Sequence, residues 1–183
     1  MALYHFSVRH VSRGKGQMVV ASAAYISGQR IFDSYYNKIH DYTSKSGVIF
    51  TEILTPEYVP ERLTDRETLW NEVEHVERNN KAQLAYSFDI ALQNELTLEE
   101  NIRLAKEFCQ EQFVARGMIV DLAIHEGKSD NEEEPDNPHF HVLVPIRPFT
   151  EEGIWGNKQR REYILDEDGN RVKDAKGKEM FNA

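Results

Sequence analysis

Residues 137–141, with the sequence NPHFH, place two imidazoles one residue apart directly after a proline. In an extended strand residues i and i+2 point to the same face, so His139 and His141 can converge on one metal ion while Phe140 packs into the opposite face. The β-branched and apolar residues 142–146 favour a strand, in which Pro138 is tolerated as the first residue or at an edge. The spacing therefore predicts a pair of metal ligands.

A third imidazole, His125, ends the apolar run 118–125, and the polar residues 127–136 would join the two runs as a hairpin loop. Three neutral nitrogen ligands leave a divalent metal with its full charge and open positions, as an electrophile for phosphate oxygen requires. A bare His-x-His is common by chance, and histidines beside a loop are often plain surface residues. The metal prediction therefore needs support from elsewhere in the chain.

That support comes from Tyr25, in the stretch 16–28 with the sequence GQMVVASAAYISG. The small residues 21–24 favour a helix that can lie close to a sheet, and Gly28 is a natural stop just after its C-terminus. Tyr25 is then expected in the last turn of the helix. A tyrosine that merely packs on the sheet is the ordinary alternative.

Five features together resemble the MobA/MobL-type (MobQ) plasmid mobilisation relaxases, which belong to the histidine-hydrophobe-histidine (HUH) single-strand endonucleases. They are YHF at 4–6, GQ at 16–17, the alanine-rich stretch ending in Tyr25, His125, and NPHFH at 137–141. The resemblance covers essentially the whole chain. It implies an α+β fold, a five-stranded antiparallel sheet backed by helices with the metal on its open face. It also implies that His125, His139 and His141 bind the metal while Tyr25 cuts one DNA strand and stays attached to the 5′ phosphate.

The implied chemistry is coherent. A tyrosine phenol has an unperturbed pKa of about 10, so attack on a phosphodiester at neutral pH needs nearby positive charge or a base. A three-histidine metal would supply that charge and clamp the phosphate oxygens, so that one phosphodiester is exchanged reversibly for another. Because some related relaxases use several tyrosines, Tyr35, Tyr36 and Tyr42 are rival nucleophiles, ranked below Tyr25.

One departure from the family pattern concerns the strand expected at 84–92. Many relatives carry Arg-Glu there, whereas this chain has Ser87. A carboxylate would hydrogen-bond the outer nitrogen of a ligating histidine and fix its tautomer. Asp89 points to the same face as Ser87 and is our candidate for this role in catalysis; an aspartate that simply faces water is the alternative.

The charge balance argues against DNA binding, because 22 Lys and Arg oppose 31 Asp and Glu, for a formal net charge of −9. The distribution is uneven, since residues 1–47 hold six basic residues against two acidic ones. A second basic cluster follows Trp155, whose ring could stack on a base or simply close the core. The predicted DNA contacts are Arg9, Arg13, Lys15, Arg30, Lys158, Arg160 and Arg161.

We therefore predict a metal-dependent tyrosine DNA strand transferase that nicks and rejoins the transfer origin of a mobile element. A rolling-circle replication initiator would need the same residues. A three-histidine hydrolase using water as its nucleophile, and a non-catalytic DNA-binding module with a structural metal, are the alternatives from other classes. The cofactor is expected to be Mn²⁺ or Mg²⁺ in cells, although a nitrogen-rich site favours Mn²⁺, Co²⁺, Ni²⁺ or Zn²⁺ over Mg²⁺.

The expected partners are single-stranded or locally melted origin DNA, with or without an adjacent hairpin, and accessory mobilisation or coupling proteins recruited by a further C-terminal region. Residues 1–183 are expected to form one monomeric catalytic domain cut from a longer protein. The single Cys109 suits a reducing cytoplasm, and no run of residues is apolar enough to predict membrane insertion.

The remaining elements follow from local patterns. Strands are expected at 3–11, 48–54 and 84–92, with a loop over 30–45. Thr64 or Asp65 would cap a helix with an apolar stripe through Leu69 and Val73, and Thr97 with Glu100 would form a capping box. Residues 168–169 (DG) predict the turn of a terminal hairpin spanning 161–181.

Overall fold

The computed structural model describes residues 5–127, 136–158 and 162–182. Its strands are β1 (Phe6–Ser12), β2 (Arg30–Asp33), β3 (Lys38–Asp41), β4 (Val48–Leu54), β5 (Gln83–Ala91), β6 (Val120–His125), β7 (His139–Pro145), β8 (Glu162–Tyr163) and β9 (Phe181–Asn182). Its α-helices are α1 (Val19–Ser27), α2 (Arg66–Val76) and α3 (Leu98–Gln112). No helix in these ranges is both long and apolar enough to cross a membrane.

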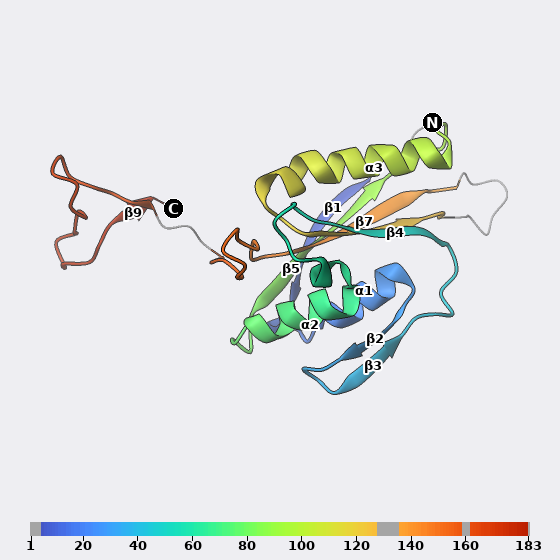
Figure 1. Ribbon diagram of the computed structural model, residues 1–183, viewed down its shortest axis with the longest axis horizontal. Helices are drawn as coiled ribbons and strands as arrows, with labels where there is room; N and C mark the ends of the chain where they lie inside the picture. The colour runs from blue at the N-terminus through green and yellow to red at the C-terminus, as the bar shows by residue number, and fades with distance from the viewer. Residues whose placement is uncertain (1–4, 128–135, 159–161, 183) are drawn as a thin grey trace.

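Five strands form the main sheet in the order β1-β5-β7-β6-β4, and every neighbouring pair is antiparallel. The sheet lies in the middle of the molecule, with α3 on one side and α1 and α2 on the other (Figure 1). This arrangement confirms the predicted α+β fold with a five-stranded antiparallel sheet backed by helices.

The alternation of side chains along each strand separates two cores. On the α3 side, Phe140, Val142 and Leu122 pack against helix residues such as Cys109. On the other side, residues of α1 and α2 pack over Ala123, Leu143 and Ala85. The histidines of β7 alternate with Phe140, so they face the α1 side, as the two-residue period predicts.

Capping side chains set the N-termini of α2 and α3. Asp65 accepts a hydrogen bond from the backbone N–H of Thr68 at 2.8 Å and caps α2. Thr97 and Glu100 form the predicted capping box of α3. These side chains satisfy N–H groups that have no partner inside the helix, so each helix begins where its cap stands.

The prediction of a loop over 30–45 was wrong, because β2 and β3 form an antiparallel hairpin there. Asp33 accepts hydrogen bonds from the N–H groups of Tyr35 and Tyr36, and Asn37 takes a positive φ of 50°. The hairpin is also tied to α2, where Asn71 bonds to Phe32 O and Ser34 N. The hairpin is thus held by contacts with a helix far away in the sequence. Its strands lack the alternating apolar pattern from which a strand could have been predicted.

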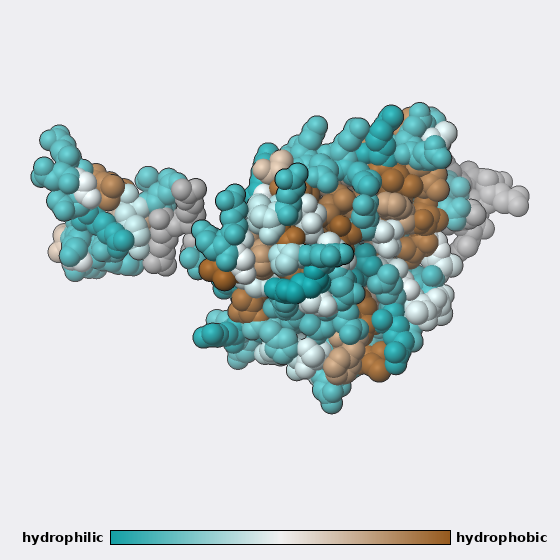
Figure 2. Space-filling view, in the orientation of Figure 1, coloured by the Kyte–Doolittle hydropathy of each residue, from teal (hydrophilic) through white to brown (hydrophobic). Residues whose placement is uncertain are grey.

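The C-terminal residues form a small separate hairpin of β8 and β9, drawn away from the main sheet in Figure 1. Its surface is mainly hydrophilic, whereas apolar side chains gather between α3 and β4 (Figure 2). The predicted turn at 168–169 is present, with Gly169 at φ 82° and its N–H bonded to Asp166 O.

Candidate metal and nucleophile site

The three predicted histidines meet at one end of the central β6–β7 pair. His125 and His139 are direct cross-strand partners. His141 lies two residue pairs further along the ladder, between Ala123 on β6 and Asp89 on β5. The ring centroids are 4.6 to 5.3 Å apart. The antiparallel pairing predicted for this hairpin is what brings the third imidazole to the other two.

The cluster fits a metal ion by its donor set. Each histidine offers one nitrogen, and these nitrogens lie within 4.8 Å of one another. Nitrogens about 2.1 Å from a shared ion are separated by roughly 3 to 4 Å, so small ring rotations would complete the site. The cluster can therefore bind a metal ion.

Backbone carbonyls fix two of the rings. His125 Nε2 lies 2.7 Å from Ile26 O, and His139 Nδ1 lies 2.8 Å from Asn137 O. A carbonyl can only accept, so these nitrogens carry the hydrogen and leave Nδ1 of His125 and Nε2 of His139 with free lone pairs. Both rings are thus held in one tautomer suited to a metal.

The position of Asn137 depends on a close approach by Gly127. Asn137 N–H bonds to Gly127 O at 2.9 Å. Gly127 has a φ of 61°, and a Cβ on it would stand 1.9 Å from Asn137 O. Glycine is therefore required at the base of this hairpin to place the carbonyl that holds His139.

Burial favours the neutral form of two of the imidazoles, those of His125 and His141. Burial, with the neighbouring His125 as a further cause, lowers the pKa of His141 to about 4, against the opposing effect of Asp89. Burial also lowers the pKa of His125, although its bond to Ile26 O acts the other way. A neutral imidazole keeps the lone pair that a metal requires.

Tyr25 stands in the last turn of α1, as predicted, and its side chain is 50% exposed. Gly28 ends the helix at φ 64°, with its N–H bonded to Ala24 O. An open cavity of about 430 Å³ is lined by Tyr25 together with His141, Asp89, Ser87 and Arg9, among others. The structure therefore brings the predicted nucleophile and one predicted metal ligand to the same cavity.

The bond from His125 to Ile26 O also joins the histidine cluster to α1. Ile26 follows Tyr25 directly, so the backbone at the end of the helix is hydrogen-bonded to a predicted metal ligand. This hydrogen bond therefore fixes the backbone of Tyr25 relative to the histidine cluster.

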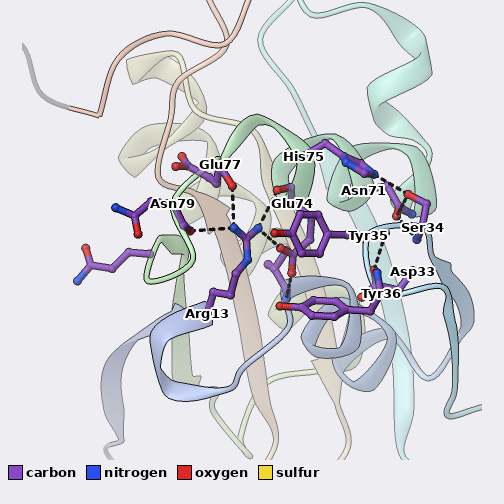
Figure 3. Close-up of polar contacts among 12 residues, drawn as sticks. Arg13, Asp33, Ser34, Tyr35, Tyr36, Asn71, Glu74, His75, Glu77 and Asn79 are labelled. Atoms are coloured by element: carbon purple, nitrogen blue, oxygen red, sulfur yellow. Dashed lines mark hydrogen bonds and ion pairs between the residues drawn. The ribbon is translucent and has the colours of Figure 1, made fainter.

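The opposite end of α1 is held by a buried ion pair. Glu74 on α2 accepts a hydrogen bond from Val19 N–H, the first residue of the helix, and from Arg13 (Figure 3). The Arg13 guanidinium also donates to the carbonyls of Glu77 and Asn79. Glu74 thus neutralises Arg13 and satisfies a free N–H of the helix that carries Tyr25.

Glu74→Ala is expected to lower the free energy of unfolding by about 3 kcal/mol, because it leaves Arg13 buried without a countercharge. Urea unfolding would measure this loss. The matched control is Glu107→Ala, whose surface pair with Arg103 at 3.9 Å should contribute less than about 0.5 kcal/mol. Equal losses in the two variants would contradict the role given to Glu74.

Of the three rival tyrosines, Tyr42 lines the same cavity as Tyr25, whereas Tyr35 and Tyr36 do not. Tyr35 stacks over Arg13, and Tyr36 lies close to the same Arg13–Glu74 pair at the start of α1 (Figure 3). Burial raises the pKa of Tyr36, which opposes phenolate formation. The rings of Tyr42 and Tyr25 form a T-shaped pair, with centroids 5.4 Å apart. Tyr25 remains our predicted nucleophile.

The predicted carboxylate Asp89 lies opposite His141 in the β5–β7 ladder. Its charge acts to raise the pKa of His141 and of His125. The hydrogen bonds that fix His125 and His139, however, come from backbone carbonyls, a contribution that no side-chain pattern reveals. A role for Asp89 beside His141 remains a prediction.

Two predicted DNA contacts need correction. The Arg13 side chain is only 5% exposed and is paired with Glu74, so it does not offer its charge to a ligand. Lys158 Nζ lies 2.9 Å from a Glu77 carboxylate oxygen and donates to Gln83 O. Trp155 packs on Phe149 in the core.

The other predicted contacts are placed differently. Arg9 and Lys15 are exposed, and Arg9 lines the cavity beside Tyr25. Arg30 is exposed with a surface ion pair to Asp41 at 3.6 Å. Arg160 and Arg161 lie outside the described residues.

Sequence reasoning also missed Lys45 as part of this site. Its ammonium lies 3.8 Å from the centroid of the Tyr25 ring. The sequence offered only its place in the basic first segment. The fold brings the loop after β3 back to the end of α1, where Lys45 N–H bonds to Tyr42 O.

The geometry defines an α+β protein that presents a tyrosine next to a three-histidine site. Comparison with known proteins places it in a family, because the MobA/MobL family matches residues 17–183. The chain belongs to the MobA/MobL family, which confirms the resemblance found in the sequence.

Two named proteins are similar to this chain. The chain is 35% identical over 191 residues to "Conjugal transfer protein TraA" of Agrobacterium fabrum, covering 99% of this chain and 16% of that protein. It is 36% identical over 174 residues to "Probable mobilization protein MobA" of Bifidobacterium longum, covering 94% of this chain and 30% of that protein. The chain thus spans a minor part of the length of these relatives.

A solved structure shares the fold. It is described as "Molecular Basis of Vancomycin Resistance Transfer in Staphylococcus aureus", with 38% sequence identity and a TM-score of 0.77. The match covers 87% of this chain and 78% of that chain.

Proposed function

We propose that this protein is a relaxase that nicks single-stranded DNA at the transfer origin of a mobile element through a covalent 5′-phosphotyrosine at Tyr25, and then rejoins it. The observation that carries the proposal is that Tyr25 and His141 line the same open cavity, with the exposed Arg9 beside them. The names of two relatives refer to conjugal transfer and to mobilization, which supports a role in DNA transfer.

The covalent step is a balanced exchange. The Tyr25 Oη–P bond forms as the P–O3′ bond breaks, and the phenol proton ends on the released 3′ hydroxyl. One phosphodiester replaces another, so no further reactant is consumed and the reverse reaction rejoins the strand. The cavity is open and Tyr25 is half exposed, as a nucleophile that must meet a polymer requires.

Charged residues of the cavity would orient the phosphate. The Arg9 guanidinium can donate two parallel hydrogen bonds to its oxygens. Asp89, opposite His141 on the neighbouring strand, would stabilise by its negative charge a cation held by the histidines. His125, His139 and His141 would hold the metal.

A divalent ion on three neutral imidazoles keeps its full charge and serves as a Lewis acid for phosphate oxygens. The donor set is nitrogen-rich, which favours Mn²⁺, Co²⁺, Ni²⁺ or Zn²⁺ by affinity, whereas Mn²⁺ and Mg²⁺ are the ions we propose for the cell.

The direct test is incubation of the protein with labelled single-stranded DNA from its element's transfer origin, with and without Mn²⁺. The proposal predicts a labelled band at the protein's position on a denaturing gel, in the presence of metal and only with the origin sequence. Cleaved DNA without a protein-bound label would contradict it and favour a hydrolase.

Arg9→Gln is expected to weaken binding of origin DNA and to reduce the slope of log K against log salt by about 0.7, the value for one phosphate contact on a single strand. Fluorescence anisotropy at several salt concentrations measures both quantities. Lys176→Gln is the charge-matched control at an exposed turn. An unchanged slope for Arg9→Gln would place the DNA on another surface.

Further parts of the proposal concern the whole protein. Residues 1–183 would act as one monomeric catalytic domain in the cytoplasm, and accessory mobilisation or coupling proteins would bind a further C-terminal region. Arg160 and Arg161 keep their predicted role in DNA binding. A rolling-circle initiator would share the chemistry and differ in the DNA sequence it recognises.

A further inference from the structure

Lys45 makes two contacts with the predicted nucleophile. Its Nζ lies 3.8 Å from the centroid of the Tyr25 ring and donates a hydrogen bond to Tyr25 O at 3.0 Å. Gln29 N–H bonds to Ala24 O, so it does not take up the carbonyl of Tyr25. One ammonium therefore fixes both the ring and the backbone of the same residue.

The loop that carries Lys45 is tied to the site on both sides. Tyr42 N–H bonds to Gln29 O just beyond α1, and Lys45 N–H bonds to Tyr42 O. Two residues after Lys45, Gly47 O accepts a hydrogen bond from Glu126 N–H, next to the metal ligand His125. Lys45 is thus held between the nucleophile helix and the histidine strand.

In the part of the chain that the structure describes, Lys45 forms no ion pair with an acidic residue. Within residues 5–127, 136–158 and 162–182, no carboxylate oxygen lies within 4.0 Å of its ammonium. The side chain is half-buried, and burial lowers its pKa. A cation in such a place is poorly screened, and an anion beside Tyr25 would relieve the unfavourable desolvation.

We propose that Lys45 is a positioning residue for the nucleophile: it holds the Tyr25 ring for attack, and its charge stabilises the phosphate as that group becomes attached to Tyr25. This proposal rests on the proposed function. The end of α1 contributes a partial negative charge that opposes an incoming phosphate, and Lys45 offsets it at the carbonyl nearest to the reaction. Stabilisation of charge that develops only during reaction raises the rate more than the affinity.

Three variants separate this role from simple capping of the helix. Lys45→Gln keeps a donor for Tyr25 O but loses the charge, whereas Lys45→Arg keeps both. Lys176→Gln removes one lysine charge from an exposed turn as the control. Thermal unfolding and metal content should be the same in all three, since the half-exposed loop does not form the core.

The measurement is the single-turnover rate of adduct formation at saturating origin DNA, with Kd determined separately by anisotropy. Lys45→Gln should slow adduct formation at least about tenfold and change Kd less than about threefold, while Lys45→Arg stays within about threefold of the wild-type rate. A wild-type rate for Lys45→Gln, an equal loss in Lys45→Arg, or a loss confined to Kd would each overturn the proposal. If the wild-type protein forms no adduct, the proposed function itself fails.

A second readout needs neither metal nor DNA. The ring of Tyr25 should shift the ε-methylene proton resonances of Lys45 upfield in the NMR spectrum, and Tyr25→Leu should remove that shift. Unshifted Lys45 resonances in the wild-type protein would overturn the positioning role, whatever the rates show.

Discussion

Tyr25→Phe is expected to abolish the covalent adduct with origin DNA, by more than about 10³-fold in rate, while binding of DNA and of metal stays unchanged. Phenylalanine keeps the ring that Tyr42 and Lys45 contact, so the site should keep its shape, but the attacking oxygen is gone. Denaturing gels measure the adduct, anisotropy measures DNA affinity, and elemental analysis measures metal content.

Tyr35→Phe and Tyr42→Phe are the matched controls, because each removes one phenolic oxygen from the same part of the chain. Tyr35 stacks on Arg13 and should not affect the reaction. An adduct that persists in Tyr25→Phe and disappears in a control variant would move the nucleophile. DNA or ester cleavage that persists in Tyr25→Phe without any adduct would identify water as the nucleophile and the protein as a hydrolase.

His139→Ala combined with His141→Ala is expected to remove measurable metal binding, because it leaves one of the three clustered imidazoles. Calorimetric titration of the wild-type protein should show tighter binding of Mn²⁺, Co²⁺, Ni²⁺ or Zn²⁺ than of Mg²⁺, and the double variant should show none. The rate of adduct formation should fall by at least about 10²-fold, since the phosphate loses its Lewis acid.

His10→Ala is the control for this variant, because His10 is an exposed histidine on β1 that stacks on Tyr86. It should bind metal as the wild-type protein does. Full metal affinity in the double variant would place the metal elsewhere, and Mg²⁺ binding as tight as Mn²⁺ would contradict the nitrogen-rich site.

The sequence predicted the features that short-range geometry controls. Two histidines at i and i+2 share a face in any strand, and Thr97 with Glu100 can cap only the helix that follows them. Gly28 could end the Tyr25 helix because only a residue that tolerates a positive φ fits there. The family resemblance then supplied the number of strands in the sheet, whereas the order β1-β5-β7-β6-β4 came only from the structure.

Contacts between residues far apart in the chain could not be predicted from the sequence. Arg13 appeared to be a free basic residue, but its partner Glu74 is 61 positions away. Lys158 meets Glu77 and Gln83 in the same way, and the anchors of the β2–β3 hairpin lie on α2. The carbonyls of Ile26 and Asn137 that orient His125 and His139, two of the predicted metal ligands, belong to the backbone and leave no side-chain pattern in the sequence.

Peptide mapping of the protein–DNA adduct is the most direct test that Tyr25 is the nucleophile. The wild-type protein would be trapped with origin DNA and Mn²⁺, digested with nuclease and protease, and the peptides sequenced by tandem mass spectrometry. We expect a nucleotide 5′-phosphate on Tyr25, in the peptide that contains the end of α1. A nucleotide mapped to any other residue, or cleaved origin DNA with no modified peptide, would contradict it.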